Sequence, residues 1–226
     1  MRHQQNKKKT AWKKSRTFGD IKGGRMRIKL KDNIVKREHS LLKPTEFDKC
    51  PIYIMENPSR DFYFPITIDH IESVLNQLPE KDVSCITHIW LRKPNSKVNC
   101  QSYFTTGSGV YAIILYPFPK NNKISIGKSK PSHKLLTWYK GYASEPVKER
   151  DNWYIEFTEE NARRYYLERL LMHEIGHCVN VWLVYNKAAN YKSENSADNY
   201  ALNNNNSSLK FEIMAKQLYV ASQRVL

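Results

Sequence analysis

The chain has 226 residues, of which 40% are hydrophobic, and it carries a formal net charge of +15. With 5 Trp, 14 Tyr and 8 Phe it can build a packed core, which excludes a disordered polymer. No stretch approaches the roughly 20 uninterrupted apolar residues of a membrane span, and the basic N-terminus lacks the apolar segment of a secretory signal. We therefore expect a cytoplasmic protein that has no membrane partner.

The positive charge is concentrated in the first part of the chain. Residues 1–43 hold 15 Lys and Arg against 3 Asp and Glu, whereas residues 44–226 hold 22 against 19. We therefore predict a basic, partly flexible N-terminal arm over 1–43 and a separate domain over 44–226. Residues 1–24 lack apolar periodicity, and we expect most of them to be flexible. In contrast, "RMRIKLK" (25–31) alternates as an edge strand does. We expect the arm to be a solvated tail, or to bind nucleic acid or another acidic partner. Contacts with nucleic acid would be made to the phosphates.

The middle of the chain predicts short β-strands and one helix. Strand patterns occur at 50–57, 61–66, 83–91 and 109–116, and weaker ones at 122–127 and 153–157. Thr67 is the predicted N-cap of a helix whose apolar residues recur at helical spacing. The polar stretch 128–152 contains two prolines, and we expect it to loop over the body of the protein.

From residue 158 onward the pattern becomes helical. Thr158 is the predicted N-cap of a long helix, and two acidic residues follow it in the first turn. One apolar stripe of this helix must be buried, and it consists of Leu167, Leu171, Ile175, Cys178 and Trp182. A second helix is predicted to begin at Ser193 and a third to cover 209–225.

The long helix contains "HEIGH", in which His173, Glu174 and His177 follow the order H-E-x-x-H. Because positions 173 and 177 lie one turn apart on the same helix face, two imidazoles there can converge on one metal ion. Glu174 lies beside the ion and can take a proton from a water molecule that the ion polarises. Gly176 costs about 1 kcal/mol in a helix interior, so we expect another element to approach the helix closely there.

A catalytic zinc ion takes three protein ligands and keeps one open position. Glu194 is the favoured third ligand, because it opens "ENSAD" at the start of the next predicted helix. Asp198 lies one turn further on the same face, where it can accept the N–H of a ligating histidine. The alternatives for the third ligand are Asp198 itself, His133, His88 and His70.

"HEIGH" followed by "ENSADNYA" resembles the gluzincin group of zinc metallopeptidases, above all the small bacterial minigluzincin and ImmA/IrrE-type peptidases. The resemblance covers roughly residues 150–205. It implies His173, His177 and Glu194 as zinc ligands, Glu174 as general base and Asp198 as a hydrogen-bond partner of a ligand. It also implies a zincin-like α+β fold, in which a mixed sheet precedes an active-site helix and a C-terminal helical part. An edge strand of that sheet would bind extended substrate, and "GVYAIILYPFP" (109–119) is the expected one.

The sequence therefore predicts a zinc-dependent metallopeptidase that cleaves peptide bonds in a protein or peptide substrate. The alternative is a nucleic-acid-associated protein with a structural or regulatory zinc site and a basic arm. Tyr191, Tyr200 and His133 are candidates for stabilising the oxyanion. None of the four cysteines forms a C-x-x-C pair, which argues against a zinc knuckle or a thioredoxin-type site. Because no export signal is recognisable, we expect free buried thiols, with Cys178 in the core.

Overall fold

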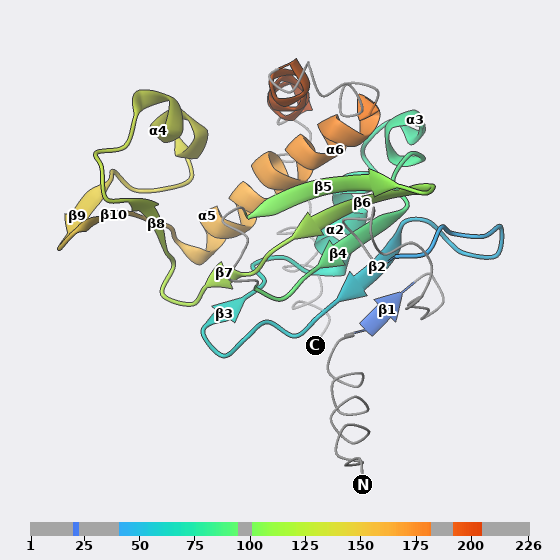
Figure 1. The fold of residues 1–226 in the computed structure, drawn as a ribbon, viewed down its shortest axis with the longest axis horizontal. Helices are drawn as coiled ribbons and strands as arrows, with labels where there is room; N and C mark the ends of the chain where they lie inside the picture. The colour runs from blue at the N-terminus through green and yellow to red at the C-terminus, as the bar shows by residue number, and fades with distance from the viewer. Residues whose placement is uncertain (1–19, 23–40, 95–100, 182–191, 205–226) are drawn as a thin grey trace, which may run out of the picture.

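The computed structural model describes residues 20–22, 41–94, 101–181 and 192–204. In these ranges the chain forms one mixed sheet, two smaller antiparallel sheets and several helices (Figure 1). This content confirms the α+β class that the sequence predicts. No helix in these ranges combines the length and the apolar character that a membrane crossing requires.

The main sheet has five strands among the described residues, in the order β1-β2-β4-β6-β5. They are β1 (Asp20–Lys22), β2 (Ile52–Met55), β4 (His88–Leu91), β5 (Ser102–Gly107) and β6 (Val110–Leu115). β2, β4 and β6 run parallel to one another, and β1 and β5 pair antiparallel. β6 has a partner on each side, so the expectation that 109–119 is the edge strand is wrong. β5 lies at that edge of the described sheet.

The basic arm contributes to this sheet. β1 pairs with β2, and Asp20–Lys22 are the residues of the segment 1–24 that the structure describes. Leu41, near the end of the arm, is buried with Ile52 and Ile54 of β2. These contacts tie the arm to the domain that the charge pattern separated from it. The predicted strand 25–31 lies outside the described residues.

The strands alternate between two apolar faces. Ile52 and Ile54 of β2 belong to one buried cluster, and Tyr53 between them belongs to the other. The larger cluster lies between the sheet and the helices, and helix α2 (Ile68–Leu75) adds its buried Ile71, Val74 and Leu75 to it. Thr67 caps α2 as predicted, because its side chain accepts a hydrogen bond from the His70 backbone N–H.

Smaller elements surround the sheet. They are β3 (Phe62–Tyr63) paired with β7 (Phe118–Pro119), the sheet of β8 (Lys123–Gly127), β10 (Asn152–Glu156) and β9 (Val147–Glu149), and the helices α3 (Glu80–Val83) and α4 (His133–Tyr139). The strand predicted over 83–91 is therefore correct only from His88 onward. The predicted loop 128–152 is wrong where α4 and β9 form.

Three consecutive helical segments form the long helix that the sequence predicts. They are α5 (Glu159–Arg164), the π-helical segment η2 (Tyr165–Leu171) and α6 (Met172–Val179). Thr158 caps the first segment through the Asn161 backbone N–H, which confirms the predicted start. Figure 1 shows α5 and α6 in one line beside β5. A further helix covers 192–204, beginning one residue before the predicted Ser193; the predicted helix 209–225 lies outside the described residues.

The predicted apolar stripe of the long helix is buried as far as the structure describes it. Leu167, Leu171, Ile175 and Cys178 are all in the core, and Trp182 lies outside the described residues. Every residue of η2 is buried, including the charged Glu168 and Arg169. The wider π-helical turn, which the sequence did not predict, immediately precedes the histidine-bearing segment.

Candidate metal centre

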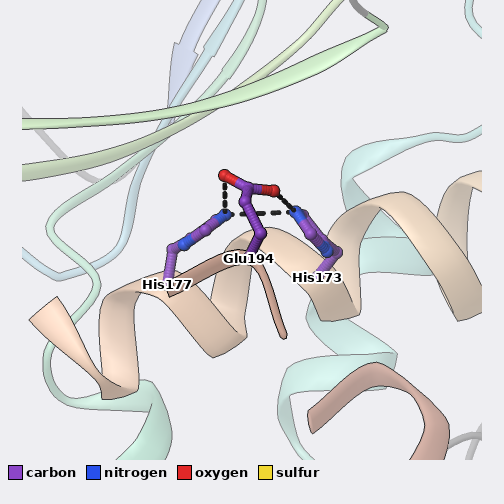
Figure 2. Close-up of side chains that lie close together, drawn as sticks. All are labelled: His173, His177 and Glu194. Atoms are coloured by element: carbon purple, nitrogen blue, oxygen red, sulfur yellow. Dashed lines mark hydrogen bonds and ion pairs between the residues drawn. The ribbon is translucent and has the colours of Figure 1, made fainter. Parts of the chain in front are cut away.

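Helix α6 presents two histidines on one face. The Nε2 atoms of His173 and His177 lie 3.1 Å apart, and the two side chains are almost buried. Figure 2 shows both imidazoles rising from the same side of the helix. The one-turn spacing in the sequence therefore produces the convergence that a shared ion requires.

Glu194 reaches this pair from the helix 192–204. One carboxylate oxygen lies 3.4 Å from His173 Nε2, and the other lies 3.5 Å from His177 Nε2. The carboxylate spans the two imidazoles in Figure 2, and its side chain is 63% exposed. Among the described residues, this is the only group of three or more His, Cys, Asp or Glu side chains close enough to share an ion. His133, His88 and His70 are not in it.

The separations fit a small tetrahedral ion. Ligand atoms at the zinc distances of about 2.0–2.1 Å are about 3.3–3.4 Å apart along the edges of a tetrahedron. The three edges here measure 3.1, 3.4 and 3.5 Å. The group could therefore hold a metal ion with three of its four positions filled by the protein.

The second nitrogen of each imidazole has a partner on the helix 192–204. His173 Nδ1 lies 3.0 Å from Asp198 Oδ1, and His177 Nδ1 lies 3.0 Å from Ser193 Oγ. When these Nδ1 atoms carry the hydrogen, the Nε2 lone pairs both face the centre of the site. The sequence predicted the position of Asp198, whereas Ser193 was predicted only as the start of its helix.

The electrostatics of the group favour one positive charge at its centre. Burial lowers the pKa of His173, but hydrogen bonds with Asp198 and Glu194 outweigh burial and raise it to about 9. Burial and the neighbouring His173 lower the pKa of His177. The hydrogen bond from His173 lowers the pKa of Glu194. The lowered pKa of Glu194 keeps a negative charge facing the two imidazoles, which favours a cation between them.

Glu174 is buried between α6 and the edge strand β5. Ser102 Oγ on β5 donates a 2.5 Å hydrogen bond to Glu174 Oε1, and the Phe104 backbone N–H donates another to the carboxylate. Burial raises the pKa of Glu174 to about 7, although the His173 charge and the Ser102 hydrogen bond oppose the rise. The sequence did not indicate Ser102, because β5 itself was not predicted.

Aromatic side chains and one arginine enclose the histidines. The Trp138 ring of α4 meets His173 edge-on, with centroids 5.2 Å apart, and Phe104 stacks on His177 at 6.3 Å. The Arg169 guanidinium lies 4.0 Å from the Trp138 ring centroid and 3.7 Å from Asp198 Oδ1. These contacts fix the ring planes of the pair and keep a positive charge near Asp198.

Gly176 marks the contact between the two helices. A Cβ atom added at Gly176 would lie 2.8 Å from Ala197 Cα and 2.9 Å from Tyr200 Cβ. The close approach predicted at this glycine is therefore confirmed. Because Ala197 lies between Glu194 and Asp198 in the sequence, this contact holds both carboxylates over the histidines.

The remaining candidate residues lie elsewhere or outside the described ranges. The Tyr200 hydroxyl donates a 2.9 Å hydrogen bond to Asp82, away from the histidine pair, and Tyr191 is outside the described residues. His133 begins α4.

No protein-family model matches the chain, and no curated protein or solved structure is similar enough to match it either.

Proposed function

We propose that this chain is a zinc-dependent metallopeptidase of the gluzincin type. His173, His177 and Glu194 are the proposed zinc ligands, and Glu174 is the proposed general base. Glu174 is the observation that carries the proposal: it does not belong to the three-ligand group, yet it is buried against β5 with a pKa of about 7. A metal site that only stabilises the fold gains nothing from such a carboxylate.

Zinc is the favoured ion because of the donor set. Two imidazoles and one carboxylate are the ligands of many catalytic zinc sites, and tetrahedral geometry leaves one position for water. Calcium and magnesium take oxygen ligands in larger numbers. When bound, zinc would lower the pKa of a coordinated water to about 7 and polarise the carbonyl group of the substrate.

The protein residues have separate roles in the proposed hydrolysis. Glu174 accepts the proton of the attacking water and later passes it to the nitrogen of the leaving amine. A general base works best when its pKa lies near the operating pH, and burial gives Glu174 such a value. Ser102 Oγ holds Oε1 of this carboxylate and so limits its rotation.

The resemblance to gluzincins also suggests how a substrate binds. An extended peptide can add a strand to the edge of a sheet, where main-chain hydrogen bonds hold it in place. β5 lies at an edge of the described sheet and carries Ser102 and Phe104, both of which contact Glu174. A peptide aligned on β5 would therefore run beside the strand whose residues contact the proposed base.

The proposal is tested by Glu174→Gln in the full-length, zinc-loaded protein. Gln keeps the shape but cannot accept the proton, so hydrolysis of a labelled unfolded protein should fall by about 100- to 10,000-fold. Elemental analysis should find zinc at the wild-type level. Glu145→Gln, an exposed position away from the site, is the matched control.

Two outcomes would contradict the proposal. Unchanged turnover in Glu174→Gln would remove the assigned base. A wild-type protein that binds zinc but cleaves no unfolded polypeptide would have a structural or regulatory site. That result would turn attention to the basic arm and to nucleic acid as its partner.

A further inference from the structure

Two cysteines lie side by side, one of them in the histidine-bearing helix α6. The Sγ atoms of Cys85 and Cys178 are 2.8 Å apart, although 93 positions separate them in the chain. Cys178 is buried in α6 directly after His177, and Cys85 is partly exposed. The expectation of buried thiols is thus confirmed for Cys178 and wrong for Cys50, which is exposed; Cys100 lies outside the described residues.

The cysteine pair lies close to the contacts among α6, α3 and the helix 192–204. Cys85 follows α3, and its thiol is within 3.1 Å of the Asp82 carbonyl oxygen. The Asp82 side chain accepts the hydrogen bond of Tyr200 from the helix 192–204. A covalent link at this point would join α6 to the chain segment between α3 and β4.

We propose that Cys85 and Cys178 are a redox-active pair that closes a reversible disulfide and so tethers helix α6 to the segment after α3. The S–S bond of a disulfide is about 2.0 Å long, so the two sulfurs need to approach by less than about 1 Å. The inference needs neither a bound metal nor the proposed peptidase activity.

The two thiols differ in solvent exposure and in reactivity, as the two cysteines of a redox-active pair must. Cys85 is the exposed partner, and the hydrogen bond from the Cys178 thiol lowers its pKa. Partly exposed thiols with stabilised thiolates react first with oxidants. Cys178 is out of solvent but in contact with Cys85, so it can attack only the sulfur of Cys85.

A peroxide is the proposed oxidant. The Cys85 thiolate attacks one peroxide oxygen, the O–O bond breaks, and Cys85 becomes a sulfenic acid while water is released after protonation. The Cys178 sulfur then attacks the Cys85 sulfur and displaces its hydroxyl group, which takes up the Cys178 proton and leaves as a second water. In total, two thiols and one hydrogen peroxide give one disulfide and two waters.

The test uses the full-length protein with and without hydrogen peroxide, followed by peptide mapping under non-reducing conditions. We expect one linked peptide pair containing Cys85 and Cys178, with the loss of two hydrogens, and its release by a dithiol reductant. The oxidised protein should melt at a higher temperature than the reduced protein, because the link restricts the unfolded chain. Cys50→Ser, which changes the exposed cysteine outside the pair, should behave like the wild type.

Cys85→Ser should give neither the linked peptide nor the rise in melting temperature. Cys85→Ala serves as a second variant if the serine form does not fold. The proposal is overturned if peroxide converts Cys85 to higher acids while Cys178 stays reduced, or if the linked peptides join other cysteines. If the oxidised protein melts at no higher temperature than the reduced protein, the proposal that the disulfide tethers α6 is overturned.

Discussion

The two helices that form the candidate metal centre are held in different ways. Every residue of α6 from Met172 to Cys178 is buried, so the core itself fixes His173 and His177. The helix 192–204 buries only Ser193, Ala197 and Ala201 among its described residues, and the Glu194 side chain is 63% exposed. The histidine pair is thus part of the packed interior, whereas Glu194 approaches it from the surface.

This difference indicates how the energy of the site is distributed. Burying two imidazoles and Glu174 in the core costs stability unless an ion or hydrogen bonds compensate. An exposed carboxylate such as Glu194 keeps much of its hydration and costs little. Substitutions in α6 should therefore change both stability and metal binding, whereas those in the helix 192–204 should act mainly on the metal.

The largest effect is expected from removing a ligand of the buried pair. His177→Ala should abolish zinc binding. Its loss of affinity should exceed the roughly 100-fold loss that follows when a ligand loses only its outer hydrogen-bond partner. Glu194→Ala should also weaken binding, but less, because water can enter at that exposed position. Elemental analysis and titration with a competing chelator measure both. Equal zinc affinity in His177→Ala and wild type would refute the metal centre.

A pH-dependent effect on stability should separate Glu174 from Glu194. In the folded protein, burial raises the pKa of Glu174 from 4.5 to about 7. Between these pH values the folded state holds a proton that the unfolded chain has lost, so the free energy of unfolding falls as the pH rises and remains lower above pH 7. Metal-free Glu174→Gln should therefore be more stable than metal-free wild type at pH 8, by up to about 3 kcal/mol.

A Glu-to-Gln substitution at the exposed Glu194 should change the free energy of unfolding in the opposite direction. The pKa of Glu194 is lowered, so its ionised form favours the folded state, and that contribution is lost as the pH falls through the lowered pKa. Glu194→Gln should then gain no stability at pH 8. Chemical denaturation at pH 5 and pH 8 measures both variants. A Glu174→Gln protein that is no more stable than wild type at pH 8 would contradict the buried, destabilising carboxyl.

The contact between the two helices is open to a smaller test. In Gly176→Ala, the new methyl group would lie 2.8 Å from the backbone of Ala197, which cannot move unless its helix moves. We expect a loss of about 1–3 kcal/mol from overpacking, against a gain of about 1 kcal/mol from helix propensity. Zinc affinity should fall as Glu194 shifts. Asn195→Ala, at an exposed position of the same helix, is the control.

The one-turn spacing within each half of the candidate site could be predicted from the sequence because it depends on helix periodicity. His173 and His177 lie one turn apart in any α-helix, as do Glu194 and Asp198. Gly176 indicated the close contact because a glycine inside a helix has a cost. These inferences needed no knowledge of which strands pair.

What the sequence did not indicate depends on tertiary contacts. β5 reads "SYFTTG", with polar residues and a glycine, and gains its stability from pairing with β6. Ser102 could not be placed near Glu174 until that strand was known. The position of β6 inside the sheet likewise follows from pairing order, which is why residues 109–119 were wrongly expected at the edge.

The smallest effects are expected where the helix 192–204 reaches the buried pair through hydrogen bonds. Asp198→Asn keeps an oxygen that can accept from His173 Nδ1 but removes its charge, and zinc affinity should fall by about 10-fold. Ser193→Ala removes a neutral partner of His177 and should cost less, because hydrogen bonds to charged groups are roughly twice as strong as neutral ones. Chelator competition measures both. A Ser193→Ala loss larger than that of Asp198→Asn would show that the buried hydroxyl, rather than the carboxylate beside Arg169, governs the orientation of the pair.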